Sequence, residues 1–319
     1  MKAALIQTYG DIKNLVHQET VLPEISPTQV LIKVHSAGVN PVDSYIRSGM
    51  FADTGTHTLP LTLGWDAAGT IDRIGSEVGA DAVEGISDLK IGDEVFVFSA
   101  FAQNGSYAEY LAVEANLVVI KPKTLSFVES AAVPLAAVTA WQALFSEGKL
   151  QAGQRVLIHN TSGGVGGFAV QLAKAAGAYV IGTASAKNKQ YVKGLGVDEF
   201  INYQTEKFED LVDSVDLVFA AVGGDNIVER SLKVIKPGGH LISALDELDH
   251  GLAEEQQVKF ERIWVQPNGQ DLNEIRKLID EGKVTVNLDS VFPLAEAQQA
   301  HARSESKRAV GKIVLEVIV

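Results

Sequence analysis

A glycine-rich segment is the clearest candidate for a chemical site in the sequence. It reads TSGGVGG over residues 161–167 and stands between the apolar run VLIH and the amphipathic run FAVQLAKAAG. Gly164, Gly166 and Ala169 match the spacing G-x-G-x-x-G/A, in which small residues allow a tight turn, a close approach to pyrophosphate and close helix packing. The free N–H groups at the start of that helix suit an anion. The segment therefore predicts dinucleotide binding by Ser162, Gly163, Gly164, Val165 and Gly166, although a glycine-rich connection without a ligand has the same pattern.

The residues after the next apolar strand indicate which dinucleotide would bind. In NAD-specific sites, an Asp or Glu about 20 residues after the glycines binds the ribose 2′-hydroxyl. Here the strand ends in IGTASAKNK, which has no carboxylate and offers Ser185, Lys187 and Lys189. Hydroxyl and ammonium donors suit a 2′-phosphate. We therefore expect NADPH as the cofactor, the alternative being that both lysines are solvated residues at the start of a helix.

Two patterns of periodicity indicate the elements that would position this site. From Gln154 onward, short Val-, Ile- and Leu-rich runs alternate with helical runs, as in a parallel sheet covered by helices. Residues 1–120 instead form short segments broken by Gly, Pro and Asp, which is typical of an all-β, barrel-like module. Between them, Ser126 and Glu129 form a capping-box pattern at the start of a helical stretch. The sequence therefore predicts two domains of different class.

Composition excludes several classes of function. The 27 Lys and Arg residues against 40 Asp and Glu give a net charge of −13 over 319 residues, which disfavours binding to nucleic acid or anionic membranes. No apolar run reaches the roughly 18 residues that span a bilayer, and the amino terminus becomes polar too soon for a secretory signal. Cysteine is absent, which excludes disulfides, thiolate nucleophiles and sulfur-ligated zinc. We expect a cytoplasmic protein.

Further motifs resemble one enzyme family over essentially the whole chain. They are SAGVNPVDSYIRSG, GWDAAG, GDEVF, GSYAEY, VPLAAVTAWQAL, AVGG and the C-terminal GKIVL. With them, the chain resembles the zinc-independent quinone oxidoreductase group of the medium-chain dehydrogenases/reductases. The resemblance implies a GroES-like β-barrel catalytic domain at residues 1–122 and 264–319, and a doubly wound, parallel-sheet Rossmann domain that binds NADPH at residues 123–263. It also implies a homodimer, with the active site in the cleft between the domains.

The resemblance bears on metal content. Relatives that bind catalytic zinc carry Cys and His at the positions of Asn40 and Trp65, and the third ligand region, PLAAV, is apolar here. We therefore expect no metal, with the Trp65 ring filling the space. Without a Lewis acid, alcohol oxidation loses its usual driving force. The expected reaction is hydride transfer from NADPH to a small electrophile, either a quinone or an α,β-unsaturated carbonyl, whose charge spreads onto a conjugated oxygen.

The resemblance also implies residues on the substrate side. The family motif N-x-x-D-x-Y-x-R-x-G is matched by Asn40, Asp43, Tyr45, Arg47 and Gly49. Tyr45 is expected to donate a hydrogen bond or a proton to the acceptor's oxygen, unless it only closes the cleft and solvent supplies the proton. Asn40 is expected to hold the nicotinamide carboxamide or the substrate oxygen. Asp43 and Arg47 are expected to form a structural ion pair or a domain contact.

The cofactor-side residues implied by the resemblance form two groups. Those near the nicotinamide and its ribose are Thr139, Val222, Gly223 and Ser243. Those around the 2′-phosphate are Ser185, Lys187, Lys189 and Tyr203. Three aromatic residues suit either the substrate wall or core packing: Tyr110, Trp141 and Trp264. A catalytically silent NADPH-binding protein, acting as a sensor or structural protein, is the alternative to an enzyme.

Overall fold

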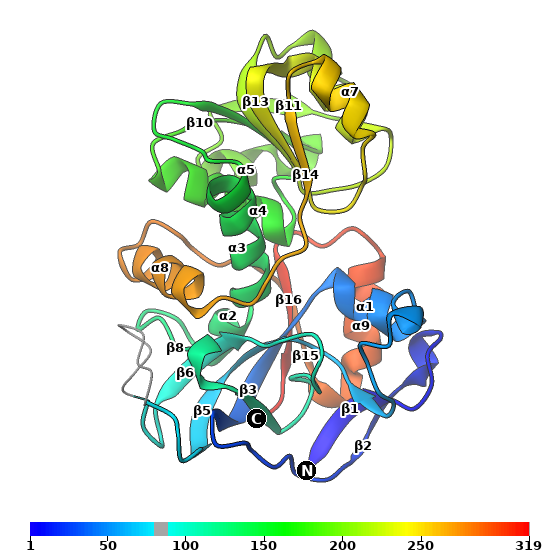
Figure 1. Ribbon diagram of the computed structural model, residues 1–319, viewed down its shortest axis with the longest axis vertical. Coiled ribbons are helices and arrows are strands. Elements are labelled where there is room, and N and C mark those ends of the chain that lie inside the picture. Colours follow the sequence, from blue (N-terminus) through cyan, green and yellow to red (C-terminus); the bar gives the residue numbers. More distant parts are fainter. Residues whose placement is uncertain (80–88, 319) are drawn as a thin grey trace. The chain divides into compact units, whose positions relative to one another are not determined.

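A computed structural model describes residues 1–79 and 89–318 as two units of different architecture (Figure 1). The first unit comprises Met1–Val138, Gln266–Asp280 and Val286–Val319, and the second comprises Thr139–Val265 and Glu281–Thr285. Within the described ranges, no helix combines the length and the apolar character that crossing a membrane would need.

The first unit is built on antiparallel strands. These are β1 (Lys2–Ile6), β2 (Leu15–Glu19), β3 (Gln29–Val39), β4 (Leu61–Thr62), β5 (Asp66–Ile74), β6 (Glu94–Phe98), β7 (Tyr110–Glu114), β8 (Val118–Ile120), β15 (Leu288–Pro293) and β16 (Lys312–Glu316). The larger sheet has seven strands in the order β15-β16-β3-β5-β6-β8, with β7 paired to β3, and a three-stranded sheet has the order β2-β1-β4. Alternate residues of β3, such as Val30, Ile32 and Val34, face a core of Val, Ile and Leu side chains.

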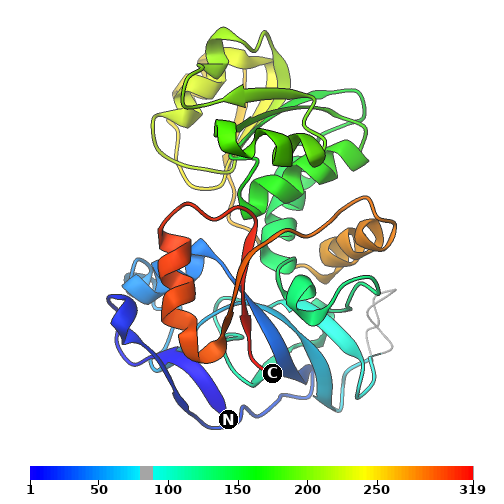
Figure 2. The same cartoon turned by 180° about the vertical axis from the view of Figure 1, so that it is seen from behind.

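The C-terminal segment enters the sheet that the N-terminal segment begins. β16 pairs antiparallel with β3, so that Ile313 lies opposite Val39, and it pairs in parallel with β15. Figure 2 shows this red strand beside the blue and cyan strands of the same unit. Residues at the very end of the chain therefore lie beside residues near position 40.

Helices accompany these sheets. They are α1 (Pro41–Ser48), α2 (Phe127–Ala131), α3 (Pro134–Trp141), α8 (Gly269–Asp280) and α9 (Ala297–Glu305). The capping box predicted at the start of α2 is confirmed, because the Ser126 hydroxyl accepts the N–H of Glu129 at 3.2 Å and Glu129 accepts the N–H of Ser126 at 2.8 Å. Both bonds satisfy donors that a helix start otherwise leaves without partners.

The second unit is a parallel sheet with helical connections. Its strands are β9 (Arg155–His159), β10 (Tyr179–Ala184), β11 (Glu199–Asn202), β12 (Val215–Ala220), β13 (Ile235–Ser243) and β14 (Lys259–Arg262). Its helices are α4 (Gly164–Ala175), α5 (Lys189–Gly194), α6 (Ile227–Ser231) and α7 (His250–Glu255), preceded by a π-helical turn at Gln142–Glu147. The six strands run in the order β11-β10-β9-β12-β13-β14, and every neighbouring pair is parallel. This is the doubly wound order of dinucleotide-binding sheets, so the predicted fold class is confirmed.

Candidate active site

The predicted cofactor residues lie at the carboxyl edge of the parallel sheet, except Thr139, which lies in α3 before the first strand of that sheet. The glycine-rich segment follows β9, Ser185 follows β10, Tyr203 follows β11, Val222 and Gly223 follow β12, and Ser243 ends β13. β10 and β11 lie on one side of β9, and β12, β13 and β14 lie on the other. The strand order therefore reverses between β9 and β12. Open α/β sheets bind ligands at the carboxyl ends of the strands, at such a switch point.

The glycine-rich segment is shaped by its backbone. Asn160 has a positive φ of 60°, and Gly163 caps α4 without any side-chain hydrogen bond to the helix start. A Cβ at Gly166 would lie 2.1 Å from the carbonyl oxygen of Asn160, so no larger residue fits while the turn keeps this form. The first N–H groups of α4 are therefore presented by a turn that has no side chains at its glycine positions, which suits an anion.

The loop after β10 is tied to this turn. The Asn188 side chain donates to the Ser162 hydroxyl at 3.0 Å, and Thr161 donates its hydroxyl to the carbonyl of Thr183 at 3.0 Å. Ser162 and Ser185 are buried. The exposed residues of this edge include Lys187, Lys189 and Tyr203. The structure thus brings the predicted phosphate residues to one edge, with both lysines exposed and the Lys189 ammonium 5.5 Å from the centre of the Phe200 ring.

Sequence reasoning missed Asp246, which supports the loop after β12 at the same edge of the sheet. Its carboxylate accepts the N–H of Gly224 at 2.6 Å, and its own N–H donates to the Ser243 hydroxyl at 3.0 Å. A Cβ at Gly223 would lie 2.4 Å from the Asp246 carboxylate, so Gly223 is needed for this approach. Ser243 is fully buried and acts here as a turn residue. An Asp in a polar loop carries no sequence signal for such a role.

Among the residues expected on the substrate side, Asn40 is buried and already hydrogen-bonded. Its side-chain N–H₂ donates to Asp66 at 2.9 Å, its side-chain oxygen accepts from the ammonium of Lys312, and Lys312 lies 3.6 Å from Asp66. We call Asn40, Asp66 and Lys312 the charge cluster. Burial raises the pKa of Asp66 and lowers that of Lys312, while the attraction between them opposes both shifts. Tyr45, five residues after Asn40 on α1, is half-buried.

The expected ion pair between Asp43 and Arg47 is wrong. One Asp43 oxygen accepts the hydroxyl of Tyr107 at 2.6 Å and the N–H of Asn40 at 2.8 Å, and Arg47 instead pairs with Glu305 of α9. Burial raises the pKa of Asp43 to about 7 against the opposing effect of these hydrogen bonds. The Asp43 carboxylate thus caps the start of α1, and Arg47 joins α1 to α9.

Trp65 is a core residue of the first unit. Its ring is fully buried, with its centroid 5.3 Å from that of Phe101 and 6.0 Å from that of His57. Of the other aromatic candidates, Trp264 is 49% exposed, Tyr110 is half-buried, and Trp141 packs edge-on against Phe145. Across residues 1–79 and 89–318, no group of three or more His, Asp and Glu side chains is placed to hold a metal ion.

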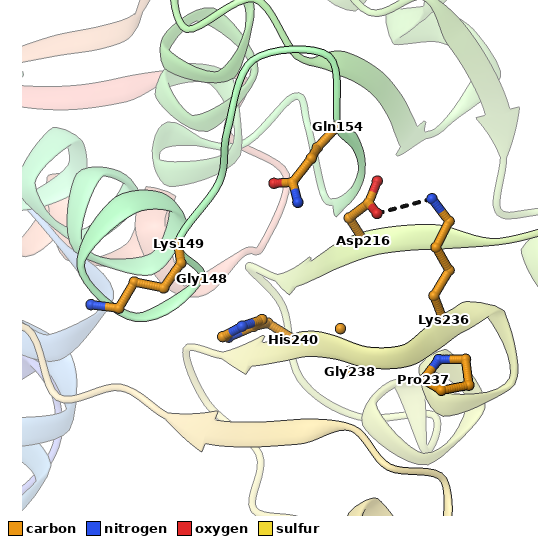
Figure 3. A pocket seen from close by; sticks show the side chains of 9 residues that line it. Gly148, Lys149, Gln154, Asp216, Lys236, Pro237, Gly238 and His240 are labelled. Atoms are coloured by element: carbon orange, nitrogen blue, oxygen red, sulfur yellow. Dashed lines mark hydrogen bonds and ion pairs between the residues drawn. The ribbon is translucent and has the colours of Figure 1, made fainter.

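A cavity of about 300 Å³ lies at the other end of the parallel strands (Figure 3). Its lining comes from the residues before and at the amino ends of β9, β12 and β13, namely Gly148, Lys149, Gln154, Asp216, Lys236, Pro237, Gly238, Gly239 and His240. Lys236 is paired with Asp216 at 2.9 Å, and the Lys149 side chain points away from that pair. No predicted site residue lines this cavity, so it is separate from the candidate cofactor edge.

Known proteins share both the fold and the sequence. Family models match residues 26–123 as an alcohol dehydrogenase GroES-like domain and residues 195–315 as a zinc-binding dehydrogenase. The chain is 36% identical to the chloroplastic NADPH-dependent alkenal/one oxidoreductase of Arabidopsis thaliana, over 99% of this chain and 79% of that protein. It is a medium-chain dehydrogenase/reductase of the quinone oxidoreductase group.

Solved structures of this family agree with the fold throughout. The quinone oxidoreductase of Coxiella burnetii matches with a TM-score of 0.89 and 33% identity, over 100% of this chain and 99% of that one. The Escherichia coli quinone oxidoreductase complexed with NADPH matches with a TM-score of 0.87 and 27% identity, over 99% and 100% of the two chains. The resemblance inferred from the motifs is confirmed.

Proposed function

We propose that this medium-chain dehydrogenase/reductase transfers a hydride from NADPH to quinones or α,β-unsaturated carbonyls without a metal. The observation that carries the proposal is the carboxyl edge of the parallel sheet, where the glycine-rich turn and Ser185, Lys187 and Lys189 come together. The oxidoreductases to which the chain is similar act, by name, on quinones and on alkenals or alkenones.

The residues at that edge fit NADPH. The N–H groups at the start of α4, in the glycine-rich turn, suit the pyrophosphate, while Ser185, Lys187, Lys189 and Tyr203 suit the 2′-phosphate end. Thr139, Val222, Gly223 and Ser243 are the proposed neighbours of the nicotinamide ribose and ring. When bound, NADPH supplies the hydride.

On the substrate side, Tyr45 is the proposed donor to the acceptor's oxygen. Its phenol O–H is placed on a helix whose start is fixed by hydrogen bonds of Asn40 and Asp43. Asn40 holds this helix start through its bonds to Asp66 and Lys312, and its amide keeps a second N–H and a second lone pair as the proposed contacts for the carboxamide or the substrate oxygen.

Independence from metal is part of the proposal. An amide at position 40 and a fully buried indole at position 65 stand where zinc-binding relatives place ligands, and the chain has no cysteine. Beside Asn40 and Asp66, the positive charge comes from the ammonium of Lys312, which lies 3.6 Å from the Asp66 carboxylate.

Domain roles, assembly and location complete the proposal. We assign catalysis to residues 1–122 and 264–319, and NADPH binding to residues 123–263. We expect a cytoplasmic homodimer with small-molecule substrates, and the strand β14, which forms one edge of the parallel sheet, offers a surface for pairing with a second copy.

The test is the loss of NADPH absorbance with a panel of naphthoquinones and enones, for the wild type and for Tyr45→Phe. We expect turnover by the wild type and a fall in kcat of about 10²- to 10⁴-fold in the variant, which is the usual range for a general acid. Tyr179→Phe is the matched control, because that hydroxyl bonds to Glu199 at 2.8 Å on the opposite end of β10. Tight NADPH binding without turnover would identify a silent NADPH-binding protein instead, and trapped radicals would identify one-electron reduction.

A further inference from the structure

Three neighbouring strands bring the charge cluster together. In the order β16-β3-β5, Ile313 lies opposite Val39 and Gly38 lies opposite Asp66. Lys312 at the start of β16, Asn40 just after β3 and Asp66 at the start of β5 therefore share one end of the sheet. Their exposures are 5%, 2% and 0%, so none of the three is a surface residue.

Each member of the charge cluster depends on the other two. The Lys312 ammonium donates to the Asn40 oxygen, and Asn40 donates at 2.9 Å to the Asp66 oxygen that lies 3.6 Å from Lys312. Removing one partner of a buried charged pair leaves the other charge without compensation. Loss of Lys312 would leave Asp66 without its counter-ion and the Asn40 oxygen without its donor, so Lys312 determines where the Asn40 amide lies.

The charge cluster holds the starts of two helices. Asn40 immediately precedes α1, which carries Tyr45. The second oxygen of Asp66 accepts the N–H of Leu135 at 2.7 Å, in the first turn of α3, which carries Thr139. The helices that carry the proposed substrate-side donor and a proposed neighbour of the nicotinamide are thus anchored to one buried carboxylate and its partners.

We propose that Lys312 is a positioning residue for Tyr45, acting through Asn40 and the start of α1. The inference rests on the proposed function, since it takes Tyr45 as the group that acts on the substrate. Lys312 itself is buried and touches Val39, Asn40 and Asp66, so it is not a catalytic residue. Small displacements of a reacting group are costly, and a misplacement of about 1 Å can reduce the rate by about 100-fold.

The first test compares Lys312→Met with Lys121→Met. Lys121 is also buried in the first unit, donates to the carbonyl of Leu125 at 2.8 Å and pairs with Glu94 at 3.1 Å. We expect kcat to fall by about 10- to 100-fold in Lys312→Met. The dissociation constant of NADPH, measured by fluorescence titration, should change much less than kcat, because the start of α3 is bonded to the Asp66 oxygen that does not pair with Lys312. A parallel fall in Lys121→Met would overturn the specific role of Lys312.

A double-mutant cycle separates positioning from general loss of stability. If Lys312 acts through Tyr45, Tyr45→Phe should reduce kcat strongly in the wild type and only weakly in the Lys312→Met background. Equal fold-changes in the two backgrounds contradict the proposal, because independent effects multiply.

Hydrogen exchange tests whether Lys312 anchors the start of α1, and this measurement does not depend on enzyme activity. Lys312→Met should accelerate exchange of the α1 amides, residues 41–48, and leave those of α4 in the second unit unchanged. Unchanged α1 exchange overturns the proposal even in an active enzyme, and accelerated exchange supports the anchoring of α1 even if no quinone or enone is reduced. Should Lys312→Met fail to fold, the double variant Asp66→Asn/Lys312→Met, which removes both charges, takes its place in all three measurements.

Discussion

The proposed substrate side and the proposed cofactor side of this protein are built by opposite means. In the first unit, polar side chains distant in sequence meet in the interior, as Asn40, Asp66 and Lys312 do, and satisfy one another. At the carboxyl edge of the second unit, the proposed binding groups are backbone N–H groups of one short turn and the exposed side chains of Lys187, Lys189 and Tyr203. Preorganisation therefore comes from long-range pairing in one unit and from local backbone shape in the other.

The largest effect is expected at the glycine-rich turn, where backbone shape forms the proposed pyrophosphate site. In Gly166→Val, the new side chain meets the carbonyl oxygen of Asn160, so the turn must open. We expect NADPH affinity to fall by at least about 100-fold, or roughly 2.7 kcal/mol, measured by fluorescence titration. Gly194→Ala is the control, because nothing lies within 4 Å of a Cβ there. Retained affinity in Gly166→Val would show that the turn is not the binding element.

The next effect probes the buried polar interior of the first unit. The pKa of Asp43 is about 7 in the folded protein, against 3.8 as its ordinary value, because of burial. Between these two pH values the folded state keeps a proton that the unfolded state has lost, so the stability contributed by Asp43 falls as pH rises and levels off above about pH 7. Asp43→Asn removes this dependence.

Urea unfolding of the wild type and of Asp43→Asn measures this pH dependence of the unfolding free energy. The variant's unfolding free energy should gain about 2 to 3 kcal/mol relative to the wild type between about pH 5 and about pH 8. Asp53→Asn, at an exposed position of the same unit, is the matched control. A pH-independent difference for Asp43→Asn would mean that Asp43 is ionised throughout this range.

A smaller effect is expected from the exposed lysines of the cofactor edge. Lys187→Ala together with Lys189→Ala should weaken NADPH binding by about 1 to 3 kcal/mol. NADH binding should stay unchanged, because NADH lacks the 2′-phosphate that these lysines are proposed to bind. Titrations with NADPH and NADH measure the two affinities. The control pair is Lys277→Ala together with Lys283→Ala, whose side chains pair with Glu274 and Glu281. An unaltered preference for NADPH would contradict the assignment of the 2′-phosphate pocket.

The smallest effect belongs to a local feature outside both sites. Ser126→Ala removes the cap of α2 and should lower the unfolding free energy by about 0.5 to 1 kcal/mol with kcat unchanged. A marked loss of activity would show that α2 contributes to the site more directly than its capping contacts indicate.

The same contrast explains what the sequence could predict. The order of strands and helices around the glycines, the capping box at Ser126 and Glu129, and the family all depend on residues close together in the chain, and the structure or the comparisons confirm them. The start of α1 had a similar local signal in NPVD, with Asn before the helix, Pro at its first position and Asp at its third, which sequence reasoning used only as part of a family motif.

The contacts of the charge cluster could not be predicted in this way. Asp66 within GWDAAG and Lys312 within GKIVL are charged residues in runs of small or apolar residues, which marks them as unusual but names no partner. Their pairing depends on the register of three strands, and Lys312 on the third of them lies 272 residues after Asn40. For the same reason, the sequence favoured Arg47 as the partner of Asp43, four residues away, over Tyr107, 64 residues away.

The position of Lys312 in the chain also sets an order of assembly. During synthesis, Asn40 and Asp66 leave the ribosome long before the strand that supplies their ammonium partner, and until then a buried carboxylate in this place has no counter-charge. A contact of such long sequence separation forms late because of the entropy of closing the intervening loop. The substrate side of the nascent protein is therefore completed only when the C-terminal strand β16 joins the sheet, whereas the glycine-rich turn needs only its own neighbouring strands.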